Sequence, residues 1–260
     1  MENANAEAQF FGQEKIWKIL LRIAPPVMLA QLIQALYNIV DSLFVGRYSE
    51  SGLTALSIIY PIQLLMMALA IGTGVGINTA MAARFGVGQK ESAQEFAGIG
   101  TPLAGILWFL FAAVTWLIMP TYASVSSPSP EVVEAVVIYG RIVWVFSFGL
   151  FFESIWTKIL QAQGDMKTPM TAQILGAVTN IVLDPLLIFG LFGLPELGIA
   201  GAAVATVMGQ VVAALVVMKK DTGNPPPKGS THGAWQRFSA WGFPTCSCSP
   251  PTPFTSSGLT

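Results

Sequence analysis

The chain has 260 residues, of which 53% are hydrophobic and only 10% are charged, whereas soluble domains carry about 25% charged residues. This composition excludes an ordinary soluble domain and predicts a membrane protein. The net charge of −1 offers no basic surface, so a nucleic-acid partner is not expected. Both cysteines stand near the C-terminal end as Cys246-Ser-Cys248, which is neither a zinc spacing nor a redox spacing.

Residues 1–22 start with acidic residues and lack the features of a secretory signal, which has a basic region, a short apolar stretch and a small-residue cleavage site. We therefore expect this segment to be retained. Residues 10–21 are expected to lie on the cytoplasmic membrane surface as an amphipathic helix.

Six segments are long and apolar enough to cross a bilayer, since a spanning helix needs about 20 mostly apolar residues. They are predicted at 23–46, 53–83, 97–119, 133–158, 170–192 and 197–218. The fold class is therefore an all-α membrane protein, with a six-helix transmembrane lobe over residues 23–220.

The basic residues predict the orientation of these helices, because cytoplasmic loops are enriched in Lys and Arg. Placing the N-terminus inside puts ten of the thirteen basic residues on the inner side, and only Arg47 in an outer loop. The ten are Lys15, Lys18, Arg22, Arg84, Lys90, Lys158, Lys167, Lys219, Lys220 and Lys228.

Two aspartates lie inside these apolar segments. With the N-terminus inside, the first and fifth helices both run outward. Asp41 is then roughly 7 Å from the outer end of the first helix and Asp184 roughly 12 Å from that of the fifth, at 1.5 Å per residue. Both carboxylates lie in the outer half of the bilayer, so they are predicted to share one site.

Polar neighbours at helical spacing support that prediction, because residues three, four or seven positions apart lie on one helix face. A polar face turned to lipid would be costly, so these faces should point into the bundle or a cavity. The face on the first helix is formed by Gln34, Tyr37, Asn38 and Asp41, and that on the fifth by Asn180 and Asp184.

The chemistry of these residues suits a hard monovalent cation such as Na⁺, which carboxylate, amide and hydroxyl oxygens bind well. The same carboxylates can take up protons, because burial and a like-charged neighbour both favour the neutral acid. Pro26 and Pro185 each free a backbone carbonyl and allow the helix to bend. We hypothesise that loading the site reshapes the first helix near Pro26.

Several ordered motifs between residues 15 and 220 resemble the multidrug and toxic compound extrusion (MATE) family. They include LAQLIQALYNIVDSLFVGR, LSIIYPIQLLMMALAIGTGVGINTAMAARFGVGQKE, ILQAQGDMKTPM and NIVLDPLLIFG. The resemblance implies a transporter rather than an enzyme, with no cofactor beyond a coupling Na⁺ or H⁺. Such proteins have twelve helices in two lobes and export amphipathic cationic compounds from cells. This chain resembles the N-terminal lobe only.

The resemblance also assigns roles to particular residues. Asp41, Asn180 and Asp184 match the cation or proton site of bacterial and archaeal members, which implies the inner membrane of a prokaryote. Pro26, Gln34 and Tyr37 match the bending proline and polar residues of the first helix, and Thr206 matches a hydroxyl on the sixth. On the fourth helix, where relatives often have Asn, this chain has Ser154 and Thr157.

Other interpretations stay open. Asp41 and Asp184 could be structural, held by polar partners between helices, and Glu153 is expected to be an interfacial charge. An intramembrane aspartyl protease is disfavoured because neither Asp has a Gly-x-Gly-Asp setting. A flippase of lipid-linked sugars from the same superfamily, or a membrane scaffold that transports nothing, are the nearer alternatives.

Residues 221–260 are rich in Pro, Ser and Thr and follow no helical or strand period. We hypothesise that the reading frame is lost near residue 220 and that the chain is a truncated lobe. The alternative is a genuine disordered cytoplasmic tail. A single lobe is expected to need a second lobe, or a second copy of the chain, as its partner for transport.

Overall fold

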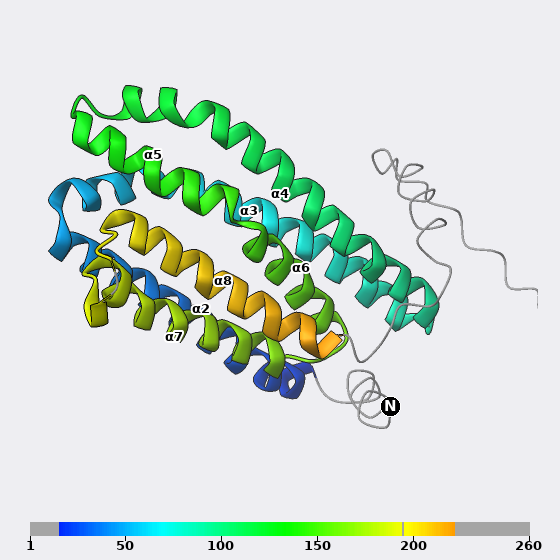
Figure 1. The fold of residues 1–260 in the computed structure, drawn as a ribbon. Coiled ribbons are helices and arrows are strands. Elements are labelled where there is room, and N and C mark those ends of the chain that lie inside the picture. Colours follow the sequence, from blue (N-terminus) through cyan, green and yellow to red (C-terminus); the bar gives the residue numbers. More distant parts are fainter. Residues whose placement is uncertain (1–15, 194, 222–260) are drawn as a thin grey trace, which may run out of the picture.

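The computed structural model describes residues 16–193 and 195–221, and over these ranges the only regular secondary structure is helical. The helices run roughly along one common direction, with α8 between α6 and α7 (Figure 1). Their bounds are Ile16–Tyr48 (α2), Glu50–Gly86 (α3), Lys90–Ser126 (α4), Pro130–Val145 (α5), Phe148–Ala162 (α6), Lys167–Ile188 (α7) and Ile199–Asp221 (α8), with a short 3₁₀ turn, Leu191–Gly193 (η1), before α8.

The prediction of six spans is confirmed in outline. Five helices are long and apolar enough to cross a membrane, and the pair α5 and α6 makes a sixth span if it is counted as one. The predicted surface helix at 10–21 lies largely outside the described residues. From Ile16 onward, α2 continues through residue 22 without a break. The sequence after Asp221 is also outside the described residues.

The fourth span is not the single helix predicted over 133–158. It is divided into α5 and α6, which are bent by 45° relative to each other. The break falls at Phe146 and Ser147, where the Ser147 hydroxyl donates to the Trp144 carbonyl over 2.7 Å, and Gly149 stands two residues after Ser147. Sharp helix kinks occur at such Gly and Ser positions. The bend determines which side chains α6 directs into the lobe.

Close packing of α7 on α8 positions the polar side chains of these two helices. Gly176 and Gly209 face each other so closely that a Cβ added to Gly209 would lie 2.7 Å from the carbonyl oxygen of Gly176. Without a hydrophobic driving force in lipid, such small residues allow helices to associate through backbone contact. Asn180, one turn after Gly176, and Thr206, just before Gly209, are thereby brought side by side.

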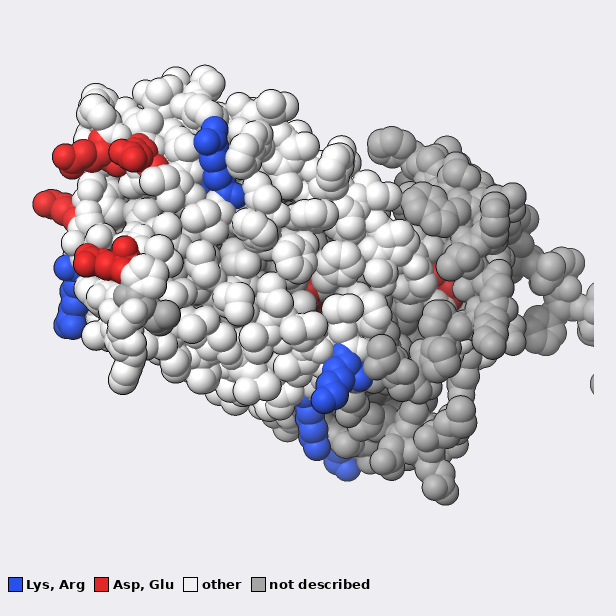
Figure 2. Space-filling model, in the orientation of Figure 1, with Lys and Arg blue, Asp and Glu red and all other residues white. Residues whose placement is uncertain are grey.

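The face of the lobe in Figure 2 is largely uncharged between its two ends. On the face in Figure 2, the acidic side chains in view gather mainly near the end where α4 and α5 are connected. Large apolar side chains such as Leu36, Leu65 and Leu117 are well exposed. An apolar exterior of this extent is what contact with lipid, or with another transmembrane lobe, requires.

Candidate functional site

The polar centre of the lobe is formed by residues from α7 and α8. The Asn180 amide donates to Asp184 Oδ1 over 3.4 Å and lies 3.5 Å from Thr206 Oγ1. The Thr206 hydroxyl in turn donates to the Ala202 carbonyl over 3.0 Å. Asp184 is fully enclosed, with 0% of its surface exposed. The four-residue spacing of Asn180 and Asp184 on one helix face produces this pair, as the sequence predicts.

Asp41 on α2 is brought to the same centre by the packing of α2 against α7. Its side chain is 8% exposed, and its charge interacts with that of Asp184. Asp41 lies seven residues before the end of α2 and Asp184 four before the end of α7, which corresponds to about 10 and 6 Å. Each acid thus lies within about 10 Å of the C-terminal end of its helix, and Asp184 is the nearer one. That the two lie at similar depth in a bilayer stays a prediction.

Three oxygen atoms of this centre are buried and lack a hydrogen-bond partner among the described residues. They are Asp41 Oδ1, Asp184 Oδ2 and Asn180 Oδ1. Buried polar atoms are normally satisfied, so such atoms call for an explanation. These oxygens can accept a hydrogen bond, take up a proton or bind a cation. As a group they are therefore suited to a small positive charge.

Tyr139 of α5 belongs to the same centre, and sequence reasoning missed it. Its side chain is 1% exposed and interacts with Thr206 and with the charges of Asp41 and Asp184. No polar residue stands three, four or seven positions away from it, so no polar periodicity marks it. The one available signal is that a tyrosine deep in a membrane helix needs a partner for its hydroxyl.

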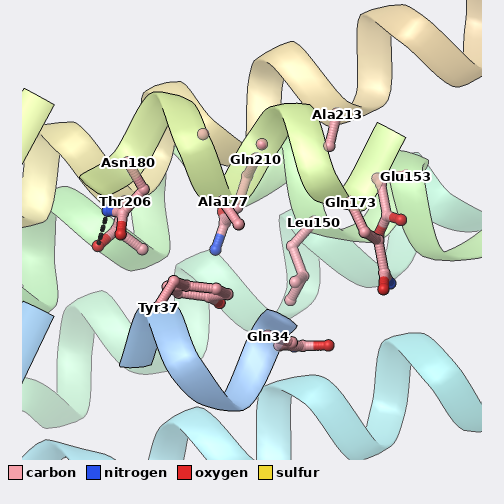
Figure 3. Close-up of a pocket in the computed structure, with 12 residues that line it drawn as sticks. Gln34, Tyr37, Leu150, Glu153, Gln173, Ala177, Asn180, Thr206, Gln210 and Ala213 are labelled. Carbon is pink, nitrogen blue, oxygen red and sulfur yellow. Dashed lines mark hydrogen bonds between the residues drawn. The ribbon is translucent and has the colours of Figure 1, made fainter. Parts of the chain in front are cut away.

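A cavity of about 60 Å³ extends from this centre between α2, α6, α7 and α8. Figure 3 shows Asn180 and Thr206 at one end of it and Glu153 and Gln173 at the other. Gln34 and Tyr37 line it from α2, as predicted. Gln210 of α8 also lines it and was not singled out from the sequence.

A second cavity, of about 70 Å³, adjoins the first. Pro26, Ser154 and Thr157 line it, together with Lys158 of α6. The predicted helix-bending proline and the two hydroxyl residues therefore lie in one place. They are separated from the Asp41 and Asp184 centre by the first cavity.

Two sequence interpretations are not supported. Asn38 is exposed and lines neither cavity, because only Gln34, Tyr37 and Asp41 turn inward from their common stretch of α2. Glu153 is not an interfacial charge, since its side chain is 9% exposed and lines both cavities. The bend between α5 and α6 and the packing of α2 and α7 around α6 enclose it.

Comparisons with known proteins agree with this arrangement. The family model MatE matches residues 26–186. The chain is 28% identical over 208 residues to the probable multidrug resistance protein YoeA of Bacillus subtilis, covering 80% of this chain and 45% of YoeA. It is 28% identical over 240 residues to the probable multidrug resistance protein NorM of Thermotoga maritima, covering 89% and 51%.

Among solved structures, a crystal structure of MATE in the bent conformation superposes with a TM-score of 0.74 at 31% identity. The match covers 81% of this chain and 46% of that one. The chain therefore spans about half the length of the relatives it matches.

Proposed function

This chain belongs to the MatE family and is a multi-pass membrane protein, and from that premise we propose that it forms one lobe of a cation-coupled drug antiporter. The compounds it helps to export are amphipathic organic cations. The coupling ion is Na⁺ or H⁺. The observation that carries the proposal is the pair of enclosed carboxyl groups, Asp41 and Asp184, with their unpartnered oxygens.

Coupling requires that the binding of a small cation to the lobe compete with the binding of the exported compound. Asp41, Asn180 and Asp184 provide carboxylate and amide oxygens for the ion, and Thr206 orients Asn180. Since Asp41 is the member of the site on α2, occupancy of the site acts on that helix. Pro25 and Pro26 interrupt the hydrogen-bond ladder of α2, so we propose that α2 bends there when the site is loaded.

Export also needs a second half. The chain spans about half of its relatives, and we propose that its partner is a second six-helix lobe or a second copy of this chain. The exposed apolar side chains of α2 and α3, such as Leu36 and Leu65, give surface for such contact and for lipid. The proposed location is the inner membrane of a prokaryote, with the N-terminus in the cytoplasm.

Accumulation of a fluorescent cation in cells that lack their own efflux pumps tests the proposal. The chain is expressed alone and joined to a second lobe of the family, each also as Asp41→Asn. We expect the joined form to lower ethidium accumulation and Asp41→Asn to restore it, because the substituted amide cannot carry the negative charge. Thr179→Val is the matched control on α7, since its hydroxyl only donates to the Leu175 carbonyl of its own helix.

Unchanged export by the joined Asp41→Asn form, at equal expression, would contradict the proposal. Export by the chain alone, lost in Asp41→Asn, would instead indicate that two copies pair to form the pump.

A further inference from the structure

The polar side chains inside the lobe form two layers along the helix axes. On α2, Gln34 precedes Asp41 by seven residues, and on α7, Gln173 precedes Asn180 by seven. Seven residues are two helical turns, or about 10 Å. The first layer is the Asp41 and Asp184 centre. The second, which we name the Glu153 layer, consists of Gln34, Glu153 and Gln173.

The Glu153 layer lies where the two cavities meet. Gln34, Glu153 and Gln173 each line both of them, as does Leu150. Glu153 comes from α6, next to Gln173 of α7 and across from Gln34 of α2 (Figure 3). Glu153 therefore lies between the rest of the second cavity and the end of the first cavity that Asn180 and Thr206 line.

The polar contacts of Glu153 leave it able to bind a cation. Its Oε1 accepts a hydrogen bond from the Thr157 hydroxyl over 3.0 Å, and the Gln173 side chain and the charge of Lys158 also interact with it. The nearby ammonium group of Lys158 donates to Gln161 Oε1 over 3.0 Å. The amide oxygen of Gln173 is buried and has no hydrogen-bond partner among the described residues. Glu153 and Gln173 both line the two cavities, so a carboxylate and an unpartnered amide oxygen are available there.

The size of the space distinguishes a small ion from a drug. Each cavity measures about 60 to 70 Å³, whereas sites for drug-sized ligands measure about 300 to 1,000 Å³. One water needs roughly 10 to 15 Å³ on this measure. An ion with a few waters therefore fits. The charge of this one carboxylate is already partly offset by the Lys158 ammonium, which also favours a single positive charge over a divalent ion.

We propose that the Glu153 layer is a second monovalent-cation site, which takes Na⁺ on its way to or from the Asp41 and Asp184 centre. The role of this second site rests on the proposed antiporter function. The existence of the site does not, because Na⁺ binding is measured without transport. Glu153 and Gln173 supply the principal oxygens, and Gln34 completes the layer from α2.

Binding of ²²Na⁺ to the purified full chain in detergent tests the proposal. The proteins are the unchanged chain, Asp41→Asn/Asp184→Asn, Glu153→Gln and the triple variant. Because the layers are two turns apart, we expect their contributions to add: the double variant and Glu153→Gln each keep about half of the bound ²²Na⁺ and the triple variant keeps none. Loss of all binding in the double variant, or no loss in Glu153→Gln, would overturn the proposal.

A second measurement leaves Glu153 unchanged, in case its substitution prevents folding. Asp41→Asn/Asp184→Asn protein is treated with a hydrophobic carbodiimide, and the modified carboxyl groups are mapped by mass spectrometry. We expect Na⁺ to protect Glu153 from modification several-fold relative to choline at equal ionic strength. Equal modification in the two salts would overturn the second site. The antiporter proposal fails separately, if Asp41→Asn leaves export unchanged.

Discussion

Asn180 is the residue that joins the parts of the candidate site. Its amide contacts both Asp184 and Thr206, and its own carbonyl oxygen is buried without a partner among the described residues. One side chain thus holds the α7 acid in place and contributes an oxygen to the cluster. A substitution of Asn180 therefore affects both the position of Asp184 and the number of oxygens in the cluster.

Replacing Asn180 by Ala should weaken Na⁺ binding at the Asp41 and Asp184 centre by about tenfold or more, which is ~1.4 kcal/mol. The change removes one oxygen and leaves Asp184 Oδ1 without its donor. Isothermal titration of Na⁺ into the purified chain measures the effect. Thr179→Val serves as control on the neighbouring position. An Asn180→Ala chain with the affinity of the control would show that Asn180 is interhelical packing only.

How far the site could be predicted depends on whether local spacing or tertiary packing creates each part. Asn180 and Asp184 are a four-residue pair on one helix, so spacing alone predicts their contact. Asn38 satisfies the same spacing rule relative to Gln34, yet it turns outward. The rule identifies a broad face of a helix, and the neighbouring helices select which part of that face is enclosed.

Glu153 could not be assigned from the sequence for the opposite reason. Its distance in sequence from Lys158 resembles an interfacial charge pair, and only the bend at Phe146 and Ser147 turns it toward α2 and α7. The six apolar segments, by contrast, were predictable because length and hydropathy are local properties. No comparable local pattern marked the break within the fourth.

At the scale of helices, the contact of α7 with α8 is the most demanding one for the site. Gly176 and Gly209 permit backbone contact there, and a Cβ on Gly209 would also lie 3.2 Å from the Cβ of Asn180. Any separation of the two helices therefore moves Asn180 away from Thr206. The stability of the lobe and the proposed ion binding therefore both depend on this contact.

Gly209→Ala should lower the stability of the chain by about 1–3 kcal/mol, because the added methyl group meets the rigid backbone of α7. Thermal unfolding in detergent measures the change. Gly72→Ala is the matched control, since a Cβ there meets no atom within 4 Å and Ala favours a helix over Gly by about 0.5–1 kcal/mol. Equal melting temperatures for the two variants would contradict the close-contact interpretation. Gly209→Ala should also weaken Na⁺ binding.

At the scale of the whole molecule, the remaining question is how the lobe lies in the membrane. The two proposed cation sites lie toward opposite ends of the lobe: the Glu153 layer lies toward the N-terminal end of α7, at Lys167, and the Asp41 and Asp184 centre lies toward its C-terminal end. If the N-terminus is cytoplasmic, as the distribution of Lys and Arg predicts, the Glu153 layer is the inner one. It would then be the last site to release the ion into the cell.

Single cysteines test this orientation after Cys246 and Cys248 are replaced by Ser. Ser126→Cys lies at the end of α4, and Gln89→Cys lies in the connection between α3 and α4; both positions are exposed. In intact cells, a membrane-impermeant maleimide should label Ser126→Cys, whereas Gln89→Cys should be labelled only after the cells are opened. The reverse pattern would place the N-terminus outside. The Glu153 layer would then be the first site that an entering ion meets.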